Sequence, residues 1–198
     1  MQTLDALLRS PHWKDHPFFL TTIRARMAFG ICCIENALEK SGIVNAGWQE
    51  VFDLLWRFPT AEEIRDLGSW YENEQEGIPY CVLDEVPYKD AHFEYLSEEQ
   101  YTRFKNLYTE AGAFICGLID TTAHIGTQCL YGGVRDGAPI TLNYLDKLTA
   151  LMKEHSVPLP DIAFFQQFSY AKDPVTDWPV WGKQISVDVL RQKSGWIR

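Results

Sequence analysis

Asp120 and His124 are the residues whose types and spacing come closest to a catalytic arrangement. They lie four positions apart in a stretch that is expected to be helical, so both side chains would share one helical face. A carboxylate in this position can orient an imidazole for base catalysis or for metal binding. Because the sequence shows no third member of such a site, the favoured interpretation is a buried polar pair that ties the helix to its neighbour.

His12 and His16 have the same spacing, but prolines on both sides of this segment disfavour a helix. An isolated histidine pair also lacks the complete ligand set that a metal ion needs, so no metal site is expected. The nucleotide-binding, zinc-protease, serine-hydrolase and EF-hand motifs do not occur, and no cofactor is predicted. An enzyme whose helical active site surrounds Asp120 and His124 remains the alternative, because active sites can be assembled from scattered residues.

Arg24 and Arg26 lie in a strongly apolar stretch of expected helix. A buried guanidinium must find a partner, because an unpaired buried charge is costly. One hypothesis is a pocket for an anionic ligand. The favoured hypothesis is an internal ion pair with a carboxylate from another helix.

The negative charge of the chain is concentrated in one segment. The whole chain has 27 acidic and 18 basic residues and a net charge of −9. Residues 62–99 hold twelve of the acidic residues and two basic ones, and they also contain several aromatic residues. Such a segment repels nucleic acid and acidic membranes and attracts basic proteins. The alternative is a solvated face that keeps the protein soluble.

The aromatic residues among the acids favour a contact surface for a basic protein, such as a nuclease toxin, since aromatic side chains anchor many interfaces. We therefore predict a partner-binding site in this segment. Its members are Glu72, Glu74, Glu76, Tyr80, Asp84, Glu85, Tyr88 and Tyr95.

Length and composition predict a mainly α, single-domain multi-helix bundle over residues 1–198, with an irregular mid-chain loop and an irregular C-terminal tail. Apolar residues make up 46% of the chain, enough for a substantial core. No stretch approaches the ~20 apolar residues of a membrane span, and the N-terminus lacks the order of a signal peptide. Five cysteines without a CxxC motif fit a reduced, cytoplasmic protein.

Apolar periodicity predicts helices over residues 17–40, 46–58, 60–75, 97–131, 141–155 and 161–168. Two capping boxes are expected, one from Thr60 to Glu63 and one from Ser97 to Gln100. Residues 79–96 show no period and are predicted to form a loop with room for one short strand. The helix over residues 97–131 contains glycines, and a break is considered near Thr121.

Two apolar stretches, RMAFGICCIENALEK (26–40) and FDLLW (52–56), resemble uncharacterised helical bacterial proteins of similar length. A small, acidic, helical chain without a catalytic motif is also similar to the immunity proteins of bacterial toxin systems. The resemblance implies an intracellular binding protein that docks its acidic aromatic segment on a cationic toxin and blocks the toxin's substrate site. A self-associating structural protein is a further alternative.

Overall fold

The computed structural model describes residues 11–43, 45–84, 86–130, 134, 137–172 and 179–196. These residues form helices and no strand, which confirms the prediction of a mainly helical bundle. Thr21 and Ser169 form a single bridge between two extended residues. The helices are η1 (Pro11–Asp15), α2 (Ile23–Lys40), α3 (Trp48–Thr60), α4 (Arg65–Glu74), η2 (Gln75–Gly77), α5 (Pro79–Val82), α6 (Glu98–Thr127), α7 (Pro139–Glu154), α8 (Ile162–Gln166) and α9 (Val187–Leu190).

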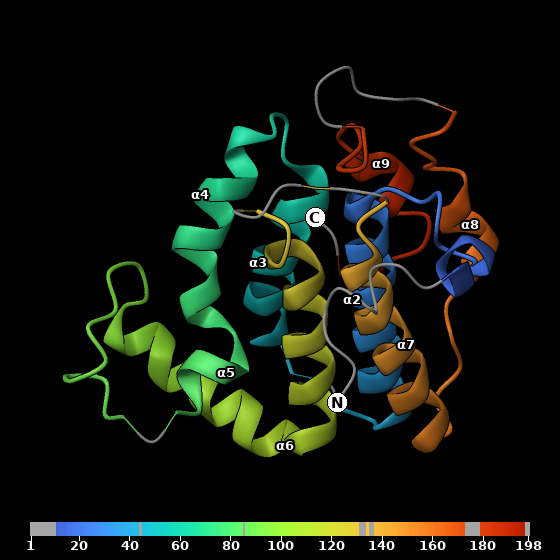
Figure 1. Cartoon of the computed structure of the whole chain (residues 1–198). Helices are drawn as coiled ribbons and strands as arrows, with labels where there is room; N and C mark the ends of the chain where they lie inside the picture. The colour runs from blue at the N-terminus through green and yellow to red at the C-terminus, as the bar shows by residue number, and fades with distance from the viewer. Residues whose placement is uncertain are drawn as a thin grey trace.

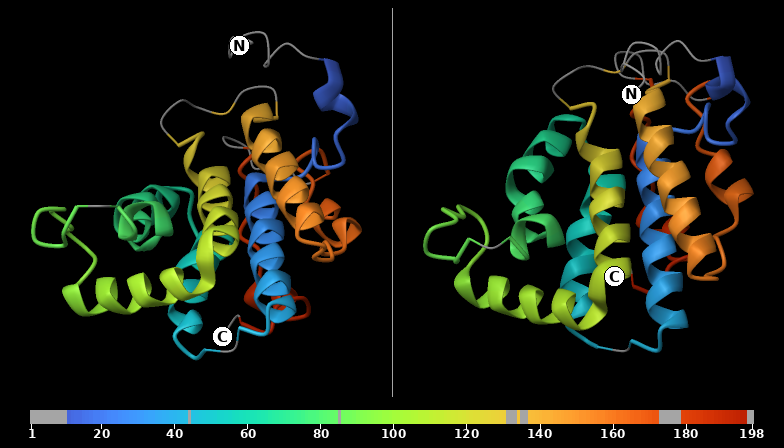
Figure 2. Two further views of the ribbon diagram at one scale, coloured as in Figure 1. Left: turned by 90° about the horizontal axis from the view of Figure 1, so that it is seen from below. Right: turned by 60° about the horizontal axis from the view of Figure 1, so that its bottom comes forward.

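The apolar helix α2 is the centre of the molecule, and α3, α6, α7 and α8 all pack against it (Figure 2). Its side chains are buried around most of its circumference, which agrees with its lack of a polar face. At Gly30, an added Cβ would lie 2.6 Å from Oγ1 of Thr122 on α6. The absence of a side chain at Gly30 therefore lets α2 and α6 approach closely.

Helix α2 begins at Ile23, whereas the periodicity predicted a start at residue 17. Its first turn is capped by Thr22 and by the C-terminal tail, because the N–H groups of Ile23 and Arg24 donate to the carbonyl oxygens of Val180 and Trp181. The apolar residues before Thr22 follow a helix-like spacing, but they form turns. Carbonyl oxygens of the tail thus accept the first N–H groups of α2, in place of the preceding helical turn that the sequence pattern predicted.

Helix α6 bends at Gly112, which has φ 78° and ψ 177°. This backbone conformation is essentially restricted to glycine, so the bend occurs at this residue and not near Thr121, where a break was considered. The second half of α6 packs against α2 and α7, and the first half runs away from them (Figure 2). The bend therefore carries the start of α6 out to one side of the bundle.

On that side lie α4, η2, α5 and the loop of residues 83–97, at the left of Figure 1. Trp70 of α4 donates its indole N–H to the carbonyl oxygen of Leu54 on α3 at 2.8 Å. Tyr108 of α6 donates its hydroxyl to the carbonyl oxygen of Gly77 at 2.6 Å. Because both bonds are buried, they fix this outer layer on the bundle.

Two local predictions for this layer are wrong. Thr60 does not cap α4, because it is the last residue of α3 and its hydroxyl donates to the carbonyl oxygen of Trp56. In the predicted loop of residues 79–96, the first four residues form the short helix α5, with Pro79 at its first position, where proline is favoured, and no strand occurs among the described residues. The second capping box, between Ser97 and Gln100, is confirmed.

The buried apolar side chains form one cluster that extends from Phe18 to Leu190. The C-terminal residues contribute to it: Trp181 is buried against Phe58, and Trp196 stacks on Phe52 with ring centroids 4.8 Å apart. Within the described part of the chain, no helix has the length and apolar content needed to cross a membrane.

Candidate functional site

The loop of residues 83–97 is held in place by the carboxylate of Glu76. Its two oxygens accept hydrogen bonds from three consecutive backbone N–H groups, those of Glu94 at 2.9 Å, Tyr95 at 2.8 Å and Leu96 at 2.9 Å. Hydrogen bonds to a charged acceptor are stronger than neutral ones. Glu76, a predicted partner contact, therefore has an internal role as the anchor of this loop.

Tyr88 is a second internal support of the same loop. Its hydroxyl donates to the carbonyl oxygen of Leu96 at 2.8 Å, and its ring packs against Phe93 and Tyr101 with centroids 5.7 and 5.3 Å away. The side chain is half-buried. Of the predicted contact residues, Tyr88 and Glu76 thus shape the loop from inside.

The other described contact residues point outward. Tyr80 and Tyr95 are 70% and 51% exposed, and Glu72 and Asp84 are exposed. The predicted contact Glu85 and the side chain of Glu74 lie outside what the structure describes. We call the outer surface of this layer the acidic flank, and its exposed members are Glu62, Glu63, Glu72, Tyr80, Asp84, Asp90, Glu94, Tyr95, Glu98 and Glu99.

Bases of the protein itself neutralise part of the acidic flank. Arg65 lies 2.6 Å from Glu63, and Arg103 lies 2.6 Å from Glu99 and 3.0 Å from Glu50. Because water screens these exposed ion pairs, they contribute little to stability. Four further carboxylates have no ion pair with a base in the described residues: Glu72, Asp90, Glu94 and Glu98. The flank therefore keeps an excess of negative charge.

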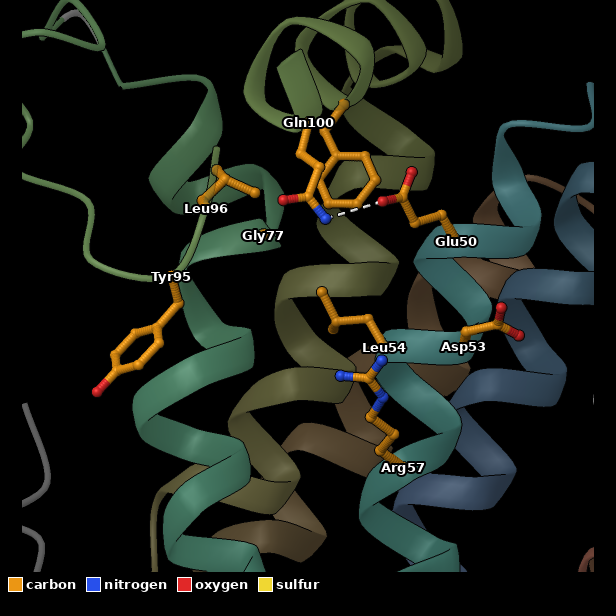
Figure 3. Close-up of a pocket in the computed structure, with 9 residues that line it drawn as sticks. Glu50, Asp53, Leu54, Arg57, Gly77, Tyr95, Leu96 and Gln100 are labelled. Atoms are coloured by element: carbon orange, nitrogen blue, oxygen red, sulfur yellow. Dashed lines mark hydrogen bonds between the residues drawn. The ribbon is translucent and has the colours of Figure 1, made fainter. Parts of the chain in front are cut away.

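A small pocket of about 140 Å³ opens beside Tyr95, between α3, η2 and the start of α6 (Figure 3). Leu54 and Phe104 are apolar lining residues of the pocket. At one side of it, the amide of Gln100 donates a hydrogen bond of 2.9 Å to the carboxylate of Glu50. The volume is below the roughly 300–1,000 Å³ of typical small-molecule sites and suits one protein side chain. Its lining residues are Glu50, Asp53, Leu54, Arg57, Gly77, Tyr95, Leu96, Gln100 and Phe104.

Sequence reasoning identified only Tyr95 among the residues of this pocket. The others come from three segments that the fold brings together, and the helix α3 residues among them follow an ordinary amphipathic pattern. Local spacing marks Gln100 only as a capping residue, and it carries no signal that would separate Glu50 from solvated surface residues.

Asp120 and His124 bond to separate backbone groups. The carboxylate of Asp120 accepts a hydrogen bond of 2.9 Å from the N–H of Tyr80, in the first turn of α5. Nδ1 of His124 lies 2.6 Å from the carbonyl oxygen of Asp120, so this nitrogen carries the proton in that bond. Burial raises the pKa of Asp120, while the Tyr80 N–H and the nearby His124 lower it. Asp120 thus joins α5 to α6, whereas His124 bonds the backbone of its own helix.

Arg24 and Arg26 are buried, but neither forms the predicted ion pair with a carboxylate of the described residues. Arg24 donates to the carbonyl oxygens of Phe58, Pro59 and Ala61 at the end of α3. Arg26 donates to the carbonyl oxygens of Phe19, Gly137 and Ala138, and to Oγ1 of Thr141. Backbone carbonyls fill the place of the expected carboxylates, because the ends of helices and turns leave such acceptors unpaired.

Glu35, in the middle of α2, is a buried acid that the sequence analysis did not single out. It is 9% exposed and accepts a hydrogen bond from the hydroxyl of Ser194 in the C-terminal tail. Burial raises its pKa to about 7, although the hydrogen bond from Ser194 and the nearby Trp56 indole lower it. The contact spans 159 residues, so no local pattern could have indicated it.

No cluster of three or more metal-ligating side chains occurs among the described residues. His16, one member of the histidine pair, lies 3.2 Å from Asp146 of α7. Searches of protein-family models, curated proteins and solved structures find no match to this chain.

Proposed function

We propose that this chain is a binding protein of the immunity type, which neutralises a cationic bacterial toxin by covering it with the acidic flank. The observation that carries the proposal is that α4, α5 and the following loop, which bear exposed acids of the flank, lie on one side of the helical bundle (Figure 1). A surface of one sign raises the local concentration of a partner of the opposite sign and speeds its association.

The rigidity of the acidic flank supports this proposal. Glu76 and Tyr88 hold the loop, and Trp70 and Tyr108 hold the helices beneath it. A surface that is ordered before binding loses less conformational entropy when the complex forms. The flank therefore has the properties of a preformed interface.

Two exposed tyrosines supply anchors within the charged surface. Tyr80 and Tyr95 present large aromatic surface to solvent, and Tyr95 borders the small pocket, which suits one inserted side chain of the partner. Carboxylates around such anchors favour a lysine or arginine as that inserted side chain. Aromatic anchors surrounded by polar groups are typical of interface hot spots.

The proposal is tested with a basic toxin that is captured by the full chain in a pull-down and identified by mass spectrometry. We expect co-expression of the chain to restore growth of cells that produce the toxin, and the two proteins to co-purify. Replacing both Tyr80 and Tyr95 by alanine should weaken the complex at least about tenfold, because each anchor contributes on the order of 1–2 kcal/mol. Leu20→Ala is the matched control, since Leu20 is 48% exposed and lies outside the acidic flank.

If the double tyrosine variant bound the toxin and protected cells as well as the unaltered chain, the assignment of Tyr80 and Tyr95 to the binding site would be wrong. A chain that protects no cell and forms only oligomers of itself in sedimentation experiments would contradict the function and support the self-associating alternative.

A further inference from the structure

The guanidinium of Arg24 uses only one of its three nitrogens in described hydrogen bonds. Nη1 donates to the carbonyl oxygens of Phe58, Pro59 and Ala61 at 3.2, 3.4 and 2.5 Å. Nε is enclosed and has no hydrogen-bond partner in the described part of the chain. Nη2 donates to no atom of the described residues and is not among the enclosed polar atoms. One edge of this buried cation is therefore available to an occupant from outside.

The other buried arginine of α2, Arg26, has no terminal nitrogen without an acceptor. Its Nη1 donates to three acceptors and its Nη2 donates to the carbonyl oxygen of Phe19 at 2.9 Å. Both terminal nitrogens of Arg26 are thus occupied, whereas Arg24 keeps one open. The difference is specific to the position of Arg24 at the start of α2.

A cavity of about 380 Å³ lies at Arg24, where the α3–α4 connection meets the C-terminal tail. The cavity is lined by the ammonium of Lys183 and the amide of Gln184, both from the tail. Ile64 is its apolar lining residue, and Glu62 is the one carboxylate among the lining residues. Gln184 donates to the carbonyl oxygen of Thr60 at 2.8 Å, which ties the tail to the end of α3. The volume is within the range of small-molecule sites.

Among the described residues, no carboxylate compensates the charge of Arg24 directly. Burial lowers the pKa of Arg24 to about 10, and Asp66 raises it to a lesser extent. The carbonyl oxygens at the end of α3 offer partial negative charge, but no carboxylate of the described residues pairs with Arg24. A buried cation of this kind is stabilised by an anion that reaches its open edge.

We propose that the cavity at Arg24 binds a small molecule through an oxyanion group, a carboxylate or a phosphate. Nη2 of Arg24 and the ammonium of Lys183 hold the oxyanion, because guanidinium and ammonium donors form charge-assisted hydrogen bonds with such groups. Ile64 contacts the apolar part of the ligand. The cavity is built by α2, the α3–α4 connection and the tail, and of its lining residues it shares only Glu62 with the acidic flank.

The test uses the full chain with inorganic phosphate and acetate as separate probes, and with sodium chloride at equal ionic strength as the reference. We expect saturable binding of at least one probe by calorimetry and a rise in Tm beyond that in chloride. Lys183→Ala should weaken binding up to about fivefold, as expected for loss of one charged contact of an exposed lysine. Lys153→Ala is the control, because Lys153 is an exposed lysine of α7 outside the cavity. The probe that binds shows whether the head group is a phosphate or a carboxylate.

Arg24→Lys keeps the charge but loses the open guanidinium edge, so binding should disappear. Arg26→Lys is its control, since it changes an equally buried arginine without an open Nη2 and should retain binding while lowering Tm. Binding that survives both Lys183→Ala and Arg24→Lys would overturn the proposal. A Tm rise no larger in phosphate or acetate than in chloride, with no heat of binding, would overturn it as well.

Discussion

The carboxylate of Glu76 accepts a hydrogen bond of 2.8 Å from the backbone N–H of Tyr95. This contact connects η2 to a loop nineteen positions further along the chain. In the sequence, Glu76 looks like one of many surface acids. In the structure, it supports the backbone that carries the exposed side chain of Tyr95. The acidic flank therefore depends on one of its own acids for its shape.

Replacing Glu76 by glutamine should lower the free energy of unfolding by about 1–3 kcal/mol. The amide has a single oxygen, so it cannot accept all three N–H groups that the carboxylate accepts. Hydrogen exchange of the amides of residues 94–96 should become faster. Glu72→Gln is the control, because Glu72 is an exposed acid of the same layer, and its effect should stay within about 0.5 kcal/mol. Equal effects of the two variants would contradict the anchoring role.

The buried acid Glu35 should make stability depend on pH. Its pKa is raised from 4.5 to about 7 in the folded chain, so the folded protein keeps a proton that the unfolded chain releases. The free energy of unfolding should therefore fall as pH rises from about 4.5 to 7, by up to about 3 kcal/mol from this residue. Glu35→Gln should reduce that fall in urea titrations at pH 5 and pH 8. The exposed neighbour Glu39 provides the control variant Glu39→Gln, and an unchanged pH dependence in Glu35→Gln would refute the assignment.

Gly112→Ala should destabilise the fold, because φ 78° with ψ 177° is strained for any residue with a Cβ. A loss of about 1–3 kcal/mol is expected in thermal or urea unfolding. Gly68→Ala is a matched comparison, since Gly68 lies inside α4 and an added Cβ meets nothing within 4 Å at either glycine. That variant should gain up to about 1 kcal/mol from helix propensity. Similar effects at both positions would argue against a bend imposed by Gly112.

Much of the fold follows from local signals in the sequence. The apolar circumference of α2 indicates its central position, and Ser97 with Gln100 marks the start of α6. Thr60 with Glu63 has a similar local signal, but α3 extends through Pro59 and uses Thr60 as its last residue. A capping pattern alone cannot determine whether the preceding helix has already ended.

The candidate sites depend on contacts that local patterns do not encode. Ser194 reaches Glu35 from the opposite end of the chain, and Glu76 meets the backbone of another loop. The sequence showed that the two buried arginines need hydrogen-bond acceptors. It did not show that backbone carbonyl oxygens, and not carboxylates, would be those acceptors. The choice between these partners is made by tertiary packing.

His124→Ala separates the binding protein from the enzyme alternative. His124 bonds the backbone of its own helix, and its ring centroid lies 5.4 Å from that of Tyr144 on α7. We expect a loss of about 1 kcal/mol in stability and unchanged toxin binding. Loss of a catalytic activity of this chain with an unchanged Tm would instead support a reacting imidazole.

The central claim, that the acidic flank receives a cationic toxin, is tested most directly by the association rate constant at several salt concentrations. The variant carries Glu72→Lys, Asp84→Lys and Glu94→Lys, and its control carries Glu39→Lys, Glu110→Lys and Glu154→Lys, which change the same number of exposed acids outside the flank. We predict that the flank variant associates at least about tenfold more slowly at low salt and loses most of the salt dependence, while the control keeps both close to those of the unaltered chain. Equal slowing by the two variants would contradict the account.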